Sequence, residues 1–251
     1  TVILHWGIHY ALFDVVTLLA GRRAAVHFHN CTPIELVPES DRAAIARSEM
    51  QIAHAVSMGL DMWTFSEFNR LTLLDWGATE SQISFVPFPV PVPILDRRSP
   101  RAEGAIRLLS VGRFVRAKGQ RTLVAALGEL SPDLRQRVEV TFAGSQTFSD
   151  PSYVDEIDEA IAAVGGRGLQ RVADVSDVEL WSLYCDHDVV VSTSLHEGLC
   201  VPVIEGYAAG CIAIGTTEAN LPYVVAGGDE VVAPEDPAAL AAAIERAAAR
   251  V

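Results

Sequence analysis

Residues 106–119 of the chain read Ile106-Arg107-Leu108-Leu109-Ser110-Val111-Gly112-Arg113-Phe114-Val115-Arg116-Ala117-Lys118-Gly119. The first half is a short apolar run typical of a buried strand, and Gly112 permits a tight turn at its end. A helical pattern begins near Gln120. A strand that leads through a glycine-containing loop into a helix is the repeating unit of parallel α/β sheets. The stretch therefore predicts an α/β fold.

The same alternation runs through the rest of the chain. Before this stretch, strands are predicted at 2–5, 24–28, 61–65 and 83–86, with helical stretches near 41–58 and 66–76. After it, strands are predicted at 138–143, 169–172, 188–192, 211–214 and 230–232. Helices fill the gaps, and Asp236-Pro237 predicts the start of a final helix that runs to the end of the chain. We expect two Rossmann-like, doubly wound domains.

A proline-rich segment separates the two series of strands. Prolines alternate with apolar residues from Pro87 to Pro93. Such a segment cannot donate hydrogen bonds in a sheet and favours a stiff, extended chain. We therefore predict a first domain at 1–86, a connector at 87–104 and a second domain at 105–251. Two such domains place a ligand cleft at the carboxyl ends of their strands.

Composition excludes several classes of partner. The formal net charge of −13 argues against a nucleic acid, which needs a concentrated basic surface. No apolar run reaches the roughly 20 residues of a membrane-spanning helix. Short basic pairs indicate solvated loops, although peripheral membrane contact stays open. The cysteines are widely spaced without a CxxC pair, which favours a reducing, cytoplasmic location; they are Cys31, Cys185, Cys200 and Cys211.

The loop after the strand at 106–111 contains groups that suit a pyrophosphate. Gly112 allows the turn, Arg113 offers a forked hydrogen-bond donor, and Lys118 stands beside the predicted helix N-terminus. The loop is neither a GxxxxGK[ST] phosphate loop nor a GxGxxG motif. Taken alone, it could equally be a solvated basic loop.

A second group of polar residues follows the apolar strand at 188–192. Pro202 predicts a helix start, so the amides before it form another anion-binding arrangement. These amides belong to Gly198, Leu199, Cys200 and Val201. Glu197 precedes the helix and Glu205 is expected in its first turn. Their alternative roles are an ordinary loop charge for Glu197 and a favourable interaction with the helix dipole for Glu205.

Together the two groups form a more specific pattern. An E-x7-E pair entering a helix, downstream of V-G-R-F-x(3)-K-G, resembles the family-4 retaining glycosyltransferases of the GT-B fold. The resemblance runs from about Ala105 to the end, and further similar segments are Cys185-Asp186-His187-Asp188-Val189, Glu205-Gly206-Tyr207-Ala208-Ala209-Gly210 and Asp236-Pro237-Ala238-Ala239-Leu240. Segments at 27–33, 65–70 and 83–88 are similar to later parts of the first GT-B domain.

The resemblance implies a transferase that moves a sugar from a nucleotide-diphosphate donor to a glycan or glycolipid acceptor with retention of configuration. Arg113 and Lys118 would hold the donor diphosphate, Glu205 would bind the ribose hydroxyls, and Glu197 would meet the sugar. Stabilisation of the leaving group by these cations would require no metal, and no cofactor is implied besides the donor substrate. Such an enzyme would serve the assembly of a cell-surface glycan.

The histidines near residue 28 have alternative interpretations. His29 matches a position where the resemblance places a histidine beside the donor sugar, and it could also be satisfied by backbone groups at a strand end. His27 is two residues before His29, so both side chains are expected on the same face of the strand. A metal site at His-x-His is not expected, because the sequence shows no third ligand.

Several features depart from the family pattern. The chain shows neither the expected glycine-rich loop after the first strand nor a final helix returning to the first domain, so we expect truncation at both ends and an incomplete acceptor site. Gly198-Leu199-Cys200 replaces the usual Gly-Phe-Gly, and His196 replaces Ser or Gly. Two other functions remain open: a non-catalytic nucleotide-sugar-binding protein, and a nucleotide-sugar 2-epimerase, which the E-x7-E stretch fits less well.

Overall fold

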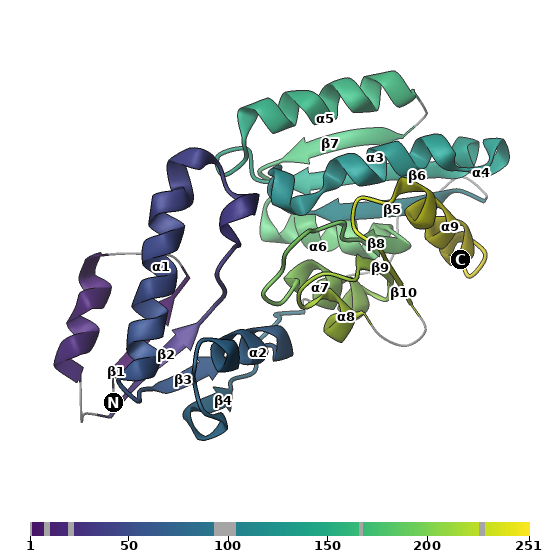
Figure 1. Ribbon diagram of the computed structural model, residues 1–251. Coiled ribbons are helices and arrows are strands. Elements are labelled where there is room, and N and C mark those ends of the chain that lie inside the picture. The colour runs from purple at the N-terminus through teal and green to yellow at the C-terminus, as the bar shows by residue number, and fades with distance from the viewer. Residues whose placement is uncertain (1, 8–10, 20–22, 93–103, 166–167, 226–228) are drawn as a thin grey trace. The chain divides into compact units, whose positions relative to one another are not determined.

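The chain forms two compact units. The computed structural model describes residues 2–7, 11–19, 23–92, 104–165, 168–225 and 229–251 (Figure 1). Unit 1 comprises residues 1–89 and 196–199, and unit 2 comprises residues 90–195 and 200–251. The predicted connector at 87–104 falls mostly outside the described residues, and its described part up to residue 92 contains neither helix nor strand.

Unit 1 contains a four-stranded parallel sheet with the order β1-β2-β3-β4. Its strands are β1 (Val2–Trp6), β2 (Ala24–Phe28), β3 (Asp61–Thr64) and β4 (Ile83–Phe85). All four lie where the apolar runs predict them. Its longer helices, α1 (Glu39–Ser57) and α2 (Glu67–Asp75), also confirm the predicted helical stretches. The short 3-10 helices η2 (Ile34–Leu36) and η3 (Glu80–Gln82) complete the connections.

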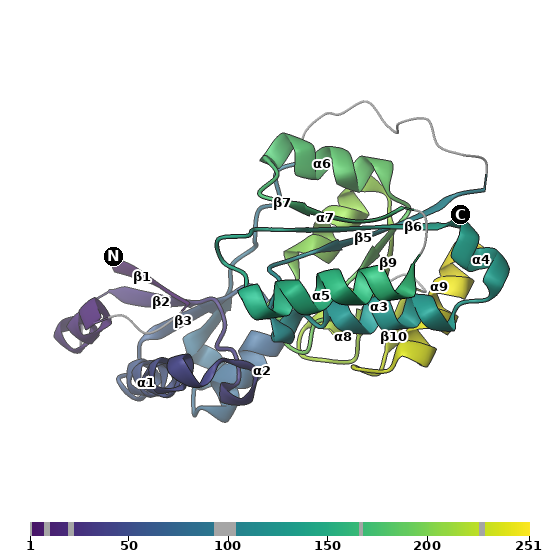
Figure 2. The ribbon, with the colours of Figure 1, turned by 90° about the horizontal axis from the view of Figure 1, so that it is seen from above.

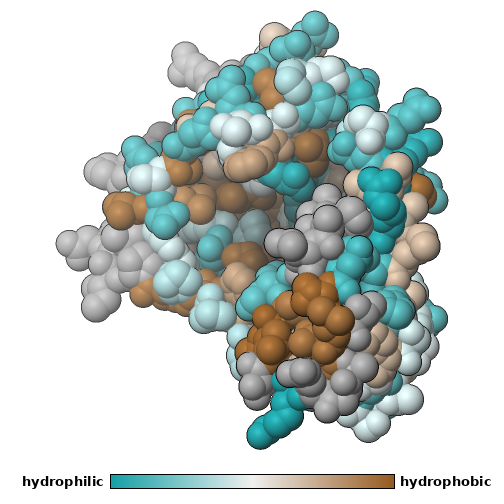
Figure 3. Space-filling view, turned by 90° about the vertical axis from the view of Figure 1, so that its left-hand side faces the viewer, coloured by the Kyte–Doolittle hydropathy of each residue, from teal (hydrophilic) through white to brown (hydrophobic). Residues whose placement is uncertain are grey.

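One further element of unit 1 was not predicted from the sequence. The 3-10 helix η1 (Ala11–Leu19) follows β1. Phe13 and Val16 are buried in the unit's core, whereas Leu18 is 74% exposed. Figure 3 shows the hydrophobic side chains that gather on the surface where η1 lies. Because η1 is apolar on both its inner and outer sides, its sequence lacks the helical alternation that identified α1.

The two faces of β2 carry different chemistry. Ala24, Val26 and Phe28 are buried in the core of unit 1. Since successive side chains of a strand point to opposite faces, His27 lies on the other face. His5 of β1 is paired in register with His27, so it shares that face.

Unit 2 contains a six-stranded parallel sheet with the order β10-β9-β8-β5-β6-β7. The strands are β5 (Ile106–Val111), β6 (Val138–Gly144), β7 (Leu169–Ala173), β8 (Val189–Val191), β9 (Ile212–Thr216) and β10 (Glu230–Val232). This is the strand order of a doubly wound Rossmann-like domain. The predicted α/β class is confirmed.

Helices cover both faces of this sheet (Figure 2). They are α3 (Gln120–Glu129), α4 (Pro132–Arg137), α5 (Pro151–Val164), α6 (Asp177–Asp186), α7 (Val201–Ala209), α8 (Leu221–Val224) and α9 (Pro237–Ala248). Leu108 of β5 packs in a core with α3, α5 and α9, whereas Leu109 packs on the opposite face with α6 and α7. Strands buried on both faces read as continuous apolar runs, which explains why they could be recognised.

The winding of unit 2 changes direction between β5 and β8. β5 pairs with β6 on one side and with β8 on the other. The helix after β5 is α3 and the helix after β8 is α7, and these lie on opposite faces of the sheet. Ligands of doubly wound sheets bind outside the carboxyl ends of the strands at this switch point. The two loops singled out in the sequence leave the sheet there.

Candidate functional site

The loop after β5 is shaped by Gly119. Residues Arg116–Lys118 form the 3-10 helix η4, and Gly119 then adopts a left-handed conformation with φ of 62° before α3 begins. A Cβ on Gly119 would lie 2.2 Å from the carbonyl oxygen of Thr193. The backbone conformation therefore favours glycine, and the close approach of the loop after β8 leaves no room for a Cβ.

Gly112 and Gly144 bring the ends of β5 and β6 together. The Gly112 amide donates a hydrogen bond to the Ala143 carbonyl at 2.9 Å, and a Cβ on Gly144 would lie 2.1 Å from the Gly112 oxygen. A Cβ on Gly112 would lie 3.6 Å from Cδ of Lys118. The half-buried Lys118 side chain therefore lies beside Gly112, next to the exposed Arg113.

Hydrogen bonds tie the loop after β8 to the loop after β5. The amide of Leu195 donates to the Ala117 carbonyl at 2.8 Å. The Thr193 hydroxyl donates to the Lys118 carbonyl at 3.0 Å. Both bonds are formed within unit 2. The structure thus brings together two loops that are about 80 residues apart in the sequence, as the switch-point position requires.

The second motif is divided between the units. Cys200 and Val201 belong to unit 2, whereas the segment His196–Leu199, which contains Glu197 and Gly198, is grouped with unit 1. Cys200 is buried in a left-handed conformation with φ of 63° and caps α7, which begins at Val201 as predicted. The Cys200 thiol donates to the Ser192 hydroxyl at 3.4 Å, which anchors the helix start to the end of β8.

A cleft of about 440 Å³ opens at the carboxyl ends of β5, β6 and β7. Its volume is within the range of small-molecule sites. Of the residues proposed from the sequence, Gly112 and Arg113 line it. The other lining residues are Val111, Ala143, Gly144, Ser145, Asp174, Val175 and Leu180.

Ser145 and Asp174 are polar residues of this cleft that the sequence analysis missed. One carboxylate oxygen of Asp174 accepts hydrogen bonds from the Ser145 hydroxyl and the Gln146 amide, both at 3.0 Å. Asp174 has a φ of 51°, a strained conformation for a residue other than glycine and one found often at functional sites. Ser145 directly follows β6 and Asp174 directly follows β7. Their position just after two predicted strands was the signal that could have identified them.

Glu205 lies on α7 and is held by a tyrosine of α6. The Tyr184 hydroxyl donates to the Glu205 carboxylate at 2.7 Å. Burial raises the pKa of Glu205; the bond from Tyr184 opposes this rise, and the negative charge of Asp177 adds to it. Burial, and then the Glu205 charge, also raises the pKa of Tyr184. Tyr184 follows the cleft residue Leu180 by one helical turn, so Glu205 is linked to the cleft through α6.

The expectation that Glu205 stands in the first turn of its helix is wrong. α7 begins at Val201, so Glu205 is its fifth residue and the first turn has no acidic side chain. The stabilisation by a helix dipole falls off within the first turn. Dipole stabilisation therefore explains Glu205 less well than the sequence indicated.

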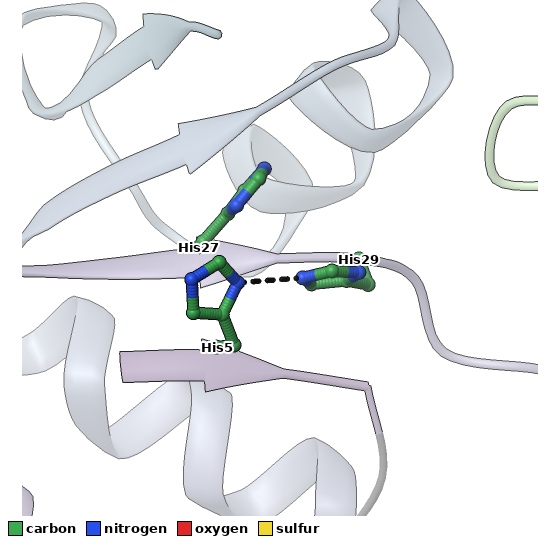
Figure 4. A group of neighbouring side chains, drawn as sticks. All are labelled: His5, His27 and His29. Atoms are coloured by element: carbon green, nitrogen blue, oxygen red, sulfur yellow. Dashed lines mark hydrogen bonds between the residues drawn. The ribbon is translucent and has the colours of Figure 1, made fainter. Parts of the chain in front are cut away.

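His29 lies in unit 1, immediately after β2. Its Nε2 is 3.2 Å from Nδ1 of His5 (Figure 4). Burial, and then electrostatic interaction with His5, lowers the pKa of His29. Its backbone is fixed by two hydrogen bonds, since its amide donates to the Trp6 carbonyl and its carbonyl accepts from the Asn69 side chain, each at 2.9 Å.

The comparisons with known proteins agree with this architecture. Residues 93–249 match the family described as "Glycosyl transferases group 1". The chain belongs to this family. No curated protein matches the chain.

Three solved structures illustrate the similarity in fold. Sucrose-phosphate synthase from Thermosynechococcus elongatus has a TM-score of 0.78 at 20% identity, covering 98% of this chain and 64% of that one. A glycosyltransferase from Rickettsia africae has a TM-score of 0.74 at 18% identity, covering 98% and 66%. HepE from Anabaena, in complex with UDP and glucose, has a TM-score of 0.72 at 15% identity, covering 93% and 66%.

These similarities show the fold of the protein. The chain spans just under two thirds of the length of each of the three structures. They support the GT-B architecture that the sequence resemblance implied. Among the described residues, no helix is both long and apolar enough to cross a membrane.

The role of Gly119 can be tested by substitution. Gly119→Ala should lower the free energy of unfolding by about 2–4 kcal/mol, because alanine is disfavoured at positive φ and its Cβ would clash with Thr193. Gly128→Ala in α3 is the matched control, since a Cβ there meets nothing within 4 Å; it should stabilise by about 0.5–1 kcal/mol. Urea unfolding followed by circular dichroism measures both. Equal effects of the two substitutions would contradict the account.

The raised pKa of Glu205 predicts a characteristic dependence on pH. The folded protein binds this proton more tightly than the unfolded chain, whose carboxyl titrates near the usual 4.5. The proton on Glu205 therefore adds to the free energy of unfolding at pH values below the unfolded pKa. This addition is lost as the pH rises through the folded pKa. Glu205→Gln removes the titration and keeps an acceptor for Tyr184, so its stability relative to the wild type should increase between about pH 4 and pH 7.

Glu179 provides a control with the opposite sign. Hydrogen bonds from Ser176 lower the pKa of Glu179. The ionised carboxylate therefore stabilises the folded protein at pH values above the pKa of the unfolded chain. Glu179→Gln should lose stability relative to the wild type over the same pH range. Urea unfolding of all three proteins at several pH values makes the comparison. Parallel curves for the wild type and Glu205→Gln would show that the Glu205 carboxyl is not perturbed by folding.

Proposed function

We propose that the protein is a retaining, family-4-type glycosyltransferase that uses a nucleotide-diphosphate sugar as donor. The observation that carries the proposal is the switch point of unit 2. There, the loop with Arg113 and Lys118 is hydrogen-bonded to the loop that leads into α7, beside a cleft at the carboxyl ends of the strands. A nucleotide-diphosphate sugar combines a flat base with a dianionic diphosphate and suits such a site.

The cations are proposed to act on the departing diphosphate. The bond between the anomeric carbon and the diphosphate oxygen breaks, and negative charge grows on that oxygen. Arg113 and Lys118 stabilise this charge through hydrogen bonds that a preorganised loop already directs toward it. The Thr193 hydroxyl donates a hydrogen bond to the Lys118 carbonyl, and the Thr193 carbonyl lies close against Gly119. Both contacts fix the backbone at Lys118 and favour such preorganisation. No metal ion is needed at the diphosphate in this scheme.

The sugar passes to an acceptor hydroxyl on the same face of the ring, which gives retention. The acceptor oxygen bonds to the anomeric carbon, and its proton goes to the leaving phosphate oxygen. From the sequence resemblance alone, Glu197 and His29 are proposed to contact the donor sugar. Glu205 is proposed to accept hydrogen bonds from the ribose hydroxyls, since its half-buried carboxylate is already oriented by Tyr184. A glycan or glycolipid is proposed as the acceptor, and the cytoplasm as the location.

Asp174 and Ser145 extend the donor site beyond the sequence motifs. Both line the cleft with Arg113, and the Asp174 carboxylate orients the Ser145 hydroxyl and the Gln146 amide. Hydroxyl and carboxylate groups there can pair with the donors and acceptors of a base edge. We propose that the base occupies this part of the cleft. UDP is the first nucleotide to test, because HepE, which shares the fold, was solved with UDP.

Arg113→Ala and Lys118→Ala should each weaken UDP binding by roughly tenfold to a hundredfold, because a charge-assisted hydrogen bond contributes about 1.5–3 kcal/mol. Uridine, which has no phosphate, should bind the variants as it binds the wild type. Arg121→Ala removes an exposed cation from the neighbouring helix α3 and is the control. Isothermal titration measures all affinities, and release of UDP from UDP-glucose measures turnover, which should fall by roughly two orders of magnitude.

Two outcomes would change the proposal. Unaltered UDP affinity in both loop variants would remove Arg113 and Lys118 from the site. Tight, phosphate-dependent binding without turnover in the presence of sugar acceptors would favour a nucleotide-sugar-binding protein, while formation of an epimeric donor without acceptor would favour a 2-epimerase.

A further inference from the structure

Three histidines gather on one face of the sheet of unit 1. His5 lies on β1 directly opposite His27 of β2 in the parallel register, and His29 follows two residues later. Figure 4 shows their rings close together at the ends of the two strands. Period-two alternation and strand pairing place all three on the same side, opposite the buried core formed by Val26 and Phe28.

The spacing of the ring nitrogens suits a shared metal ion. One ligand nitrogen from each histidine lies within 4.8 Å of the other two. Nδ1 of His5 and Nε2 of His29 are 3.2 Å apart. Two nitrogens bound tetrahedrally at about 2.0–2.1 Å from zinc are separated by about 3.3 Å, so this pair already has the required separation. The His27 ring contributes the third nitrogen of the group.

His27 adds an independent indication. Its Nε2 is buried and has no hydrogen-bond partner. An unsatisfied buried polar atom costs about 1–3 kcal/mol, so native structures rarely keep one without a reason. The neighbours of this ring are the other two histidines and Phe65, whose ring centroid is 5.6 Å away. A metal ion would satisfy the buried nitrogen, whereas an apolar ring cannot.

The surroundings favour the ligand form of the rings. Burial, followed by repulsion from His29 and His5, lowers the pKa of His27, and this direction is the one that favours a metal-binding imidazole. Phe65 packs edge-on against both His27 and His29, each at 5.6 Å between centroids. An apolar wall beside a metal site limits access of water and holds ligand rings in place. The two backbone hydrogen bonds of His29 fix its position further.

We propose that His5, His27 and His29 bind one divalent transition-metal ion, with Zn²⁺ as the best fit, and leave a fourth position for water or another oxygen ligand. Imidazole nitrogens are ligands that suit zinc, whereas magnesium and calcium prefer oxygen ligands. Within the residues that the structure describes, these histidines are the group of three or more ligand side chains that could share an ion. The sequence alone did not reveal it, because His5 and His27 meet only through strand pairing.

This proposal rests on the histidine geometry and not on the proposed transferase function. A metal at Nε2 of His29 would leave the other ring nitrogen of that residue for a hydrogen bond to a sugar. Metal binding can be measured without any nucleotide, so the failure of one proposal leaves the other standing.

Isothermal titration of untagged, chelator-treated protein with ZnCl₂ tests the site, together with the visible spectrum after addition of Co²⁺. We expect one ion per chain and the absorption bands of tetrahedral cobalt. His27→Ala and His29→Ala should each weaken zinc binding at least tenfold. His54→Ala, which changes an exposed histidine of α1 in the same unit, should leave the affinity unchanged.

A second variant guards against loss of folding. His5 is exposed, so His5→Gln should preserve the unfolding transition of the metal-free protein while weakening zinc binding at least tenfold. Failure to observe saturable one-to-one binding by the wild type would overturn the proposal. Zinc binding that survives both His5→Gln and His27→Ala, or that falls equally in His54→Ala, would overturn it as well.

Discussion

The parallel pairing of β5 with β8 is the constraint on which the candidate donor site depends. The two strands meet through the buried pairs Leu108–Val189 and Leu109–Val190, with every one of these side chains at 1% exposure or less. Because β6 already occupies the other side of β5, this pairing reverses the direction of winding. The loops after both strands therefore emerge side by side, and hydrogen bonds between them make one surface from two distant segments.

Glycines set the dimensions of that surface. Gly119 admits the carbonyl of Thr193, Gly144 admits that of Gly112, and Gly206 lets α7 approach the Val190 side chain, where a Cβ would lie 2.7 Å from Cγ2. Larger residues would push apart the elements that carry the cations, the cleft and Glu205. The close packing thus converts the strand order into fixed positions for charged groups, which is the condition for electrostatic stabilisation of a leaving group.

Much of the fold could be predicted because the strands are buried on both faces. Apolar runs identified every strand of the two sheets described here to within about two residues, and Asp236-Pro237 identified the start of α9. The 3-10 helix η1 was not predicted, because its exposed Leu18 breaks the alternation of apolar and polar residues that indicates a helix. The strand order itself is a matter of long-range pairing and has no local signal.

Only the part of the candidate site that lies in local sequence patterns could be predicted. Gly112, Arg113 and the start of α7 belong to local patterns and could be recognised from the sequence. Ser145 and Asp174 come from two different strand ends and belong to no motif, so only the sheet order brings them beside Arg113. Likewise, His5 meets His27 through the register of β1 on β2, which the sequence does not encode as a pattern.

Hydrogen–deuterium exchange with and without UDP tests the central claim most directly, because it reports on the backbone amides of both loops in one experiment. The account predicts slower exchange at residues 112–119 and 192–201 when UDP is bound, together with the cleft residues 145 and 174–175. Slower exchange confined to other segments, with these loops unchanged at saturating UDP, would contradict it.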